Sequence, residues 1–115
     1  MALLDAIVAI AMSATRLEIL KTMVEQKPED AFGRYGLAME YVRAGDLETA
    51  VAEFENLLKF NPTYSAGYFH AGQTLEKLAR IEDARQMYRR GIEVTSANGD
   101  AHTQSELIAA LRMLA

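Results

Sequence analysis

Few side chains in this sequence have the types and the spacing that chemistry at an active site requires. The two histidines, His70 and His102, are far apart in the chain and have no metal-ligand spacing around them. The chain has no cysteine, no glycine-rich phosphate loop and no HExxH motif. Its carboxylates are scattered at the spacing of solvated helix faces. We therefore expect no catalytic residue, no metal ion and no cofactor, and we predict that the chain is not an enzyme.

Both histidines have simpler interpretations than catalysis. His102 follows Asp100 in the first turn of a predicted helix, where a surface or capping role is expected. His70 lies within another predicted helix, where we expect it to make a polar contact with a bound partner.

Composition limits both the fold and the class of partner. The 115 residues are the length of one domain, and half of them are apolar, so that a packed core needs no disulfide. The formal net charge is −4, which gives no basic stripe for nucleic acid. A local basic cluster is expected to be a solvated helix face paired with Glu82 and Asp83; the alternative is a contact with an acidic end of another copy. The cluster consists of Lys77, Arg80, Arg85, Arg89 and Arg90.

Hydrophobic periodicity predicts helices along the whole chain and no strand. Pro28 disfavours helix at the residue before it. Gly45 and Asp46 predict a turn in which the aspartate caps the following helix, and residues 98–100 (Asn-Gly-Asp) predict another turn. The expected helices cover residues 13–26, 29–43, 46–60, 64–78, 82–95 and 100–114.

The chain resembles itself at an offset of 34 residues. Pro28 and Pro62 are separated by this interval, and Ser96 follows Pro62 at the same interval. Between these marks the same order of apolar, aromatic and small residues occurs twice. The first set is Leu37, Ala38, Tyr41, Gly45, Leu47, Ala50 and Phe54, and its counterparts are Ala71, Gly72, Leu75, Ala79, Ile81, Ala84 and Tyr88. This period and pattern resemble the tetratricopeptide repeat, a helix–turn–helix unit.

The resemblance implies an all-α solenoid in which two repeats, at about residues 31–64 and 65–98, are flanked by capping helices. The repeat domain is expected to cover residues 13–115, with the helices at 13–26 and 100–114 as caps. Arg34 stands where the family usually has Trp, so that this pocket must be filled differently. Ser96 replaces the closing proline, which predicts a longer helix before it.

In the family, the first helix of each repeat lines a concave groove that binds other proteins. Carried over by register, this groove is expected to bind an apolar peptide or helix, with Arg43 and Lys77 at its rim. A clamp for a peptide carboxylate is not expected, because Tyr, Met, Phe and Gln occupy the places of its Lys, Arg and Asn. For Phe32 and Phe69, packing against neighbouring helices is an equal alternative. The groove residues are Phe32, Tyr35, Met39, Val42, Phe69, His70, Gln73, Lys77 and Leu107, with Thr103 and Gln104 as further candidates.

Residues 1–12 form an apolar N-terminal extension whose one charged side chain is Asp5. The run is too short to span a bilayer, and it lacks the leading Lys or Arg of a signal peptide. We expect it to dock as a helix on its own chain or on another copy. The alternatives are that it extends the first helix and packs on its own chain, or that it is a disordered extension; packing on its own chain is favoured. Whether Met1 or Met12 is the native start stays open. The candidate self-association residues are Leu3, Leu4, Ile7, Val8 and Ile10.

The sequence thus predicts a non-catalytic function in protein–protein interaction. One interpretation is an adaptor module that binds an apolar peptide or helix in its groove and self-associates. The alternative is a structural subunit of a ring, tube or filament that is linked through the N-terminal extension. We expect no nucleic-acid partner and no membrane span, and we favour a cytoplasmic location while export stays open.

Overall fold

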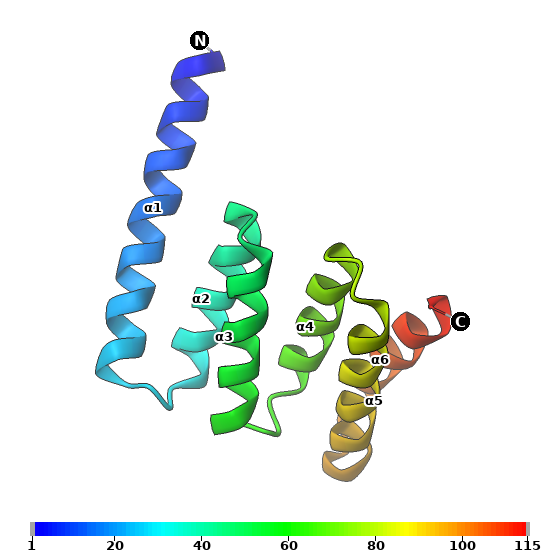
Figure 1. Ribbon diagram of the computed structural model, residues 1–115. Helices are drawn as coiled ribbons and strands as arrows, with labels where there is room; N and C mark the ends of the chain where they lie inside the picture. The colour runs from blue at the N-terminus through cyan, green and yellow to red at the C-terminus, as the bar shows by residue number, and fades with distance from the viewer. Residues whose placement is uncertain (1, 115) are drawn as a thin grey trace.

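The computed structural model describes residues 2–114, without the side chains of residues 13 and 14, and over this range it contains six α-helices and no strand. Each helix packs on the next one along the chain, and α4 also contacts α6 (Figure 1). The helices are α1 (Ala2–Gln26), α2 (Ala31–Ala44), α3 (Leu47–Phe60), α4 (Ser65–Lys77), α5 (Ile81–Asn98) and α6 (Ala101–Met113). The predicted all-α fold is confirmed.

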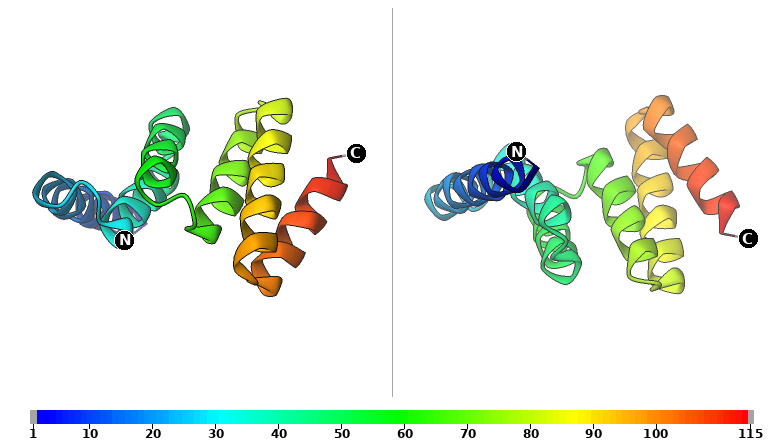
Figure 2. Two further views of the ribbon diagram at one scale, coloured as in Figure 1. Left: turned by 90° about the horizontal axis from the view of Figure 1, so that it is seen from below. Right: turned by 90° about the horizontal axis from the view of Figure 1, so that it is seen from above.

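The helices form a stack with α1 at one end and α6 at the other (Figure 2). The core lies inside this stack and is built from the positions that repeat at 34 residues. Phe54 and Tyr88 occupy the same position of the two repeats, and both are completely buried. Ala50 and Ala84 are also completely buried, since a small residue lets the helices of a pair approach closely.

Turn and cap residues fix where the helices begin and end. Gly45 has φ 80°, and the Asp46 carboxylate accepts a hydrogen bond from the backbone N–H of Thr49, as predicted. The predicted start of the second helix, near residue 29, is wrong. Asp30 is its N-cap and accepts a hydrogen bond from the backbone N–H of Phe32, so that α2 begins at Ala31.

The loss of the closing proline at Ser96 lengthens α5, as predicted. This helix has 18 residues, whereas its counterpart α3 has 14. The two helices that follow are therefore spaced differently: α2, α4 and α6 begin at residues 31, 65 and 101, so that the first interval is 34 residues and the second is 36. Register carried over from α4 to α6 is displaced by two residues.

The first helix is longer than its predicted bounds. It was expected to begin at residue 13, with an extension through residues 1–12 as an alternative, and α1 runs without a break from Ala2 to Gln26. No proline or glycine interrupts residues 2–26, and this stretch is rich in Ala, Leu and Met, which are strong helix formers. The second half of α1 lies against α2, where Leu20 approaches Gly36 and Val24 approaches Gly33.

The basic cluster forms ion pairs on its own surface, as predicted. Arg80 pairs with Asp83 at 3.0 Å, and Arg85 and Arg89 both approach Glu82. In addition, Arg80 reaches Glu48 on α3. Among the described residues, no helix is long and apolar enough to cross a membrane.

Candidate functional site

The first helices of the two repeats present matching faces. Phe32, Tyr35, Met39 and Val42 follow one another at spacings of three and four residues along α2, so that they share one side of the helix. Their counterparts on α4 are Ala66, Phe69, Gln73 and Glu76. We call these two helix faces, together with the facing side of α6, the groove face.

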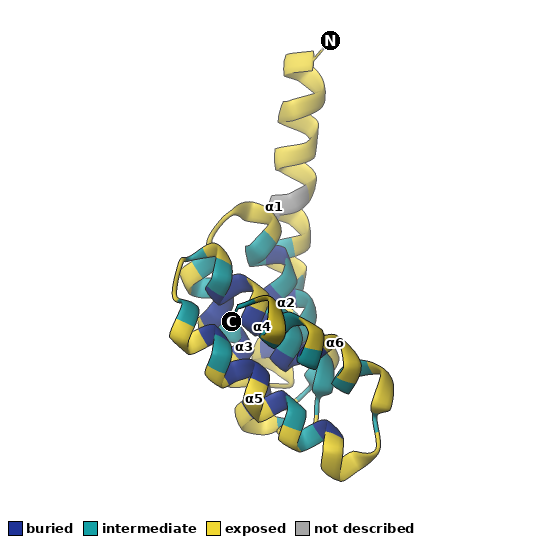
Figure 3. Cartoon of the chain, turned by 90° about the vertical axis from the view of Figure 1, so that its right-hand side faces the viewer, coloured by how far each residue is buried: buried dark blue, intermediate teal, exposed yellow. Residues whose placement is uncertain are grey.

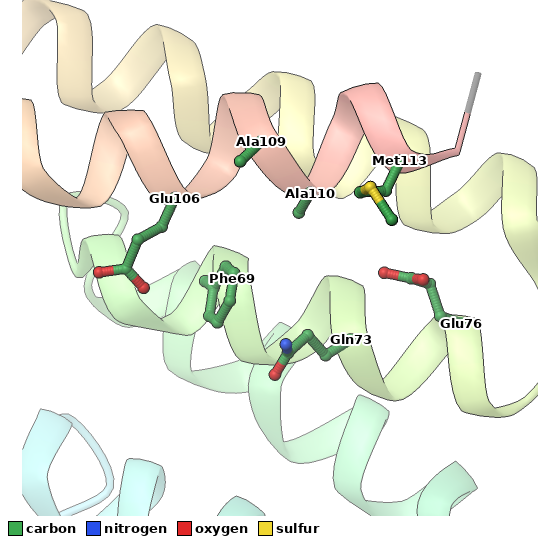
Figure 4. A pocket seen from close by; sticks show the side chains of 7 residues that line it. All are labelled: Phe69, Gln73, Glu76, Glu106, Ala109, Ala110 and Met113. Atoms are coloured by element: carbon green, nitrogen blue, oxygen red, sulfur yellow. The ribbon is translucent and has the colours of Figure 1, made fainter.

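A hollow of the groove face lies between α4 and α6 (Figure 4). This α4–α6 pocket has a volume of about 480 Å³. It is lined by Phe69, Gln73 and Glu76 from α4 and by Glu106, Ala109, Ala110 and Met113 from α6.

The pocket combines an apolar floor with acidic ends. Phe69, the two alanines and Met113 supply the apolar surface, and Met113 is 85% exposed. Glu76 and Glu106 lie towards opposite ends of the pocket (Figure 4). Tyr88 donates its hydroxyl proton to Glu76, and Nε2 of His102 lies 2.8 Å from Glu106. Such a surface fits an apolar side chain with positive charge on its flanks.

A chain of aromatic rings links α2 to the pocket. The ring of Tyr35 lies 5.4 Å from that of Tyr64 and 5.6 Å from that of His70. His70 in turn lies 5.4 Å from Phe69, in an edge-to-face arrangement. Offset and edge-to-face pairs of this kind stabilise aromatic clusters beyond simple burial. The position of Phe69 in the pocket is therefore held by contacts that begin on the neighbouring repeat.

Burial changes the proton affinity of this cluster. Burial lowers the pKa of His70, the nearby Lys77 lowers it further, and the Glu106 carboxylate opposes the shift. Burial also raises the pKa of the Tyr35 and Tyr64 hydroxyls. At neutral pH the cluster is therefore uncharged, which suits an apolar partner better than an ionic one.

The predicted groove residues differ in their exposure. Phe32 is 72% exposed, whereas Tyr35, Met39, Val42 and Phe69 are half-buried against the core. Gln73 and Lys77 are exposed, and His70 is half-buried.

Leu107 is a correction. Its side chain is completely buried, where it would meet a Cβ built on Gly91, and it cannot touch a partner in the groove. The two-residue displacement of α6 is the reason, since it aligns Leu107 with the buried Ala71 instead of Gln73.

Sequence reasoning missed the α6 side of the pocket and its acidic ends. The α6 residues that line it are Glu106, Ala109, Ala110 and Met113, whereas Thr103, Gln104 and Leu107 were expected. The signal that could have found them is the missing proline at Ser96, because a longer α5 changes the register of the helix after it.

The N-terminal segment extends α1 beyond the other helices (Figure 3). Its large apolar side chains are exposed: Leu3, Leu4, Ile7, Val8, Ile10 and Met12. The favoured expectation that this segment packs on its own chain is therefore not observed.

The family model of the tetratricopeptide repeat matches residues 33–64 and 65–98, more than half of the chain. The chain belongs to the tetratricopeptide repeat family. A TPR repeat-containing protein of Pseudomonas aeruginosa is 30% identical over 98 residues, which cover 85% of this chain and 93% of that protein.

Solved tetratricopeptide repeat structures have the same fold. The solution structure of a repeat domain from Salinibacter ruber is 39% identical, with a TM-score of 0.72 over 76% of this chain and 89% of that one. The TPR2B domain of yeast Sti1, solved as a pHsp70 complex, has a TM-score of 0.82 over 96% of this chain and 88% of that one. At 12% identity this second likeness concerns the fold alone.

The tetratricopeptide repeat architecture accounts for the surface available to a partner. Stacked repeats leave the first helix of each pair on a shared face, and here that face carries the aromatic cluster and the α4–α6 pocket. Among the described residues, no group of three or more His, Asp or Glu side chains is placed to hold a metal ion.

Proposed function

We propose that this chain is a non-catalytic protein-interaction module that binds an apolar peptide or helix on its groove face and also self-associates. The observation that carries the proposal is the α4–α6 pocket, an apolar hollow with a carboxylate towards each end. Tetratricopeptide repeat proteins generally act as interaction modules, and a structural neighbour of this chain was solved as a pHsp70 complex.

The pocket also favours a class of partner. Phe69, Ala109 and Met113 offer surface to an apolar side chain, and the small alanines let a partner backbone come close. Glu76 and Glu106 favour Lys or Arg on either side of that apolar anchor. Lys77 at the rim can meet acidic groups farther along the bound segment, as can Arg43, which also pairs with Glu40 at 2.9 Å.

The experiment is a selection of peptides from a random displayed library by the full chain. The selected peptides should carry apolar anchors flanked by Lys or Arg, and a labelled one serves to measure affinity. Ala109→Arg should weaken its binding at least about tenfold, because a cation then lies on the apolar floor. Ala97→Arg is the matched control, since Ala97 is exposed on α5 and lies outside the pocket. Equal affinity of the two variants would place the binding surface elsewhere.

The second candidate is a structural subunit of a larger assembly. The exposed apolar N-terminal segment favours it, because such a surface is seldom left in water by a monomer. Light scattering after size exclusion, on the full chain and on a version that starts at Met12, separates the candidates. A large particle that is lost in the shorter version supports the assembly, whereas a small mass of the full chain supports the adaptor.

A further inference from the structure

Part of the apolar surface of α1 lies on the side that faces away from α2. In the second half, Leu17, Leu20 and Val24 face α2 and are half-buried or buried. At 3.6 residues per turn, the same side of the first half holds Ala2, Ala6 and Ala9. Leu3 and Ile10 precede Leu17 and Val24 at intervals of seven residues and lie near this side as well. Leu4, Val8 and Met12 lie on the other side of α1, where contacts with its own chain do not cover them.

An apolar stripe runs along this uncovered side. It consists of Leu4, Val8, Ala11, Met12, Thr15 and Ile19, which share one side of the helix, and we call it the α1 stripe. Leu4 is 62% exposed, Met12 56% and Ile19 56%, so the stripe is open from the free end of α1 into the part that lies against α2. Its length is about 22 Å, at about 1.5 Å per residue.

The centre of the stripe is hollow. Ala11 is small and lies between larger neighbours, which leaves a shallow depression of about 370 Å³. Its lining is Val8, Ala11, Met12, Thr15 and Arg16. In helix pairs, a hollow over a small residue receives a larger side chain of the facing helix.

We propose that the α1 stripe pairs with the same stripe of a second copy, in antiparallel orientation, and so forms a two-fold symmetric dimer. A two-fold interface brings residue i of one copy against residue j of the other, and j against i. When Met12 fills the hollow at Ala11 of the second copy, Val8 faces Thr15 and Leu4 faces Ile19. In this one register, the stripes of both copies are covered along their whole length.

Charge favours the antiparallel arrangement over the parallel one. Asp5 and Arg16 lie on the same side of α1, next to the stripe and three turns apart. The antiparallel register brings Asp5 of one copy within two residues of the position opposite Arg16 of the second copy, so that unlike charges meet. A parallel pair would bring the flank that carries Asp5 and Arg16 against the opposite flank of the second copy, so that this attraction would be lost.

The free half of α1 leaves room for this pair. Residues 2–12 extend beyond α2–α6 (Figures 1 and 3), so a second α1 can lie along them with its own repeats at the far end of the pair. Arg16 also favours the pairing of α1 with a second copy. It stands at the position of the buried Ala50 and Ala84 and pairs at 3.2 Å with Glu40 on α2, so that no preceding repeat helix can approach α1 there as closely as in the two repeats.

The first test is the mass of the full chain by light scattering. We expect a dimer, twice the 12.7 kDa of the chain. Ala11→Glu should give a monomer, because a charge then fills the hollow. Ala6→Glu should leave the dimer intact, because Ala6 is equally exposed but lies on the opposite side of α1. A monomeric or polymeric wild-type chain, or equal effects of the two substitutions, would overturn the proposal.

The second test is the register. The chain has no cysteine, so that any disulfide cross-link must come from the introduced thiols. Under mild oxidation, the double variant Leu4→Cys with Ile19→Cys should form a covalent dimer, because each thiol meets the other kind in the second copy. Either single variant should stay monomeric on a denaturing gel, since identical residues lie about 22 Å apart along the pair. Cross-linking of the Leu4→Cys variant alone would show a parallel pair and refute the register.

This inference rests on the self-association part of the proposed function and not on the groove. Ala11→Glu should therefore bind the selected peptides with unchanged affinity, and Ala109→Arg should remain dimeric. Failure of one proposal thus leaves the measurement for the other intact.

Discussion

Arg34 and Tyr68 occupy the same position of the two repeats and make the same hydrogen bond with different chemistry. Nε of Arg34 donates to the carbonyl oxygen of Pro28 at 2.6 Å, and the Tyr68 hydroxyl donates to that of Pro62 at 2.6 Å. Each bond ties the first helix of a repeat to the loop that precedes it. The family usually has Trp at this position. Here Arg34 fills it in the first repeat and Tyr68 in the second, and each supplies a hydrogen-bond donor.

The two side chains should differ in how much they stabilise the fold. Arg34 also pairs with Glu53 on α3, and its guanidinium lies 5.1 Å from the centre of the Phe60 ring. Arg34→Met should lower the free energy of unfolding by about 2 kcal/mol, because a largely buried carboxylate and a carbonyl lose their partner. Tyr68→Phe removes one hydrogen bond and should cost about 1 kcal/mol. Urea unfolding of both variants measures the difference, and an equal loss would contradict it.

The second repeat contains a close approach that admits no side chain. The ring of Tyr88 lies against Gly72, where an added Cβ would sit 2.2 Å from Cε1. Gly72→Ala should therefore lower the free energy of unfolding by about 1–3 kcal/mol, the usual cost of overpacking a core. Gly33→Ala is the matched control, since its Cβ would meet nothing closer than 3.6 Å and alanine favours helix. The unfolding temperature should therefore fall for Gly72→Ala and rise for Gly33→Ala.

The 34-residue period predicts this fold well because the helices of each repeat meet through residues of fixed size. Phe54 and Tyr88 mark the same buried position, and Gly45 and Asp46 end one helix and begin the next as expected. Such features depend on contacts between residues of one repeat, so they can be predicted directly from the sequence pattern. The groove positions on α2 and α4 follow from the same register.

Features that depend on helix length could not be carried over in this way. Replacement of the closing proline by Ser96 lengthens α5, displaces α6 by two residues and moves Leu107 from the groove to the core. The direction of the N-terminal segment was also missed. Extension of the first helix through residues 1–12 was one of the alternatives, but together with packing on its own chain, whereas α1 extends beyond the other helices.

A turn in the second repeat holds an alanine in a glycine conformation. Ala79 has φ 60°, and its counterpart Gly45 has φ 80°. A side chain at positive φ is strained, so Ala79→Gly should raise the free energy of unfolding by about 1 kcal/mol. Gly45→Ala should lower it by a similar amount, because a Cβ there has no neighbour within 4 Å and the cost is conformational. Denaturant midpoints of both variants test this, and a loss of stability in Ala79→Gly would contradict it.

His70 should make the stability of the repeats depend on pH. Its pKa in the folded chain is lowered from the ordinary value of 6.5, chiefly by burial. As the pH falls through 6.5, the unfolded chain therefore takes up a proton before the folded chain does, and the free energy of unfolding falls. Stability from this group is complete above that pH and is lost progressively below it, until the folded chain is protonated as well.

Substitution of each histidine in turn assigns this dependence to one side chain. His70→Gln should lower stability at every pH, because ring contacts with Tyr35 and Phe69 are lost, but its unfolding temperature should change less between pH 7.5 and pH 5.5 than that of the wild-type chain. His102→Gln should keep the wild-type change, because the His102 side chain is 87% exposed and lies outside the aromatic cluster. If His102→Gln were the variant that lost the pH dependence, burial of His70 would not be its cause.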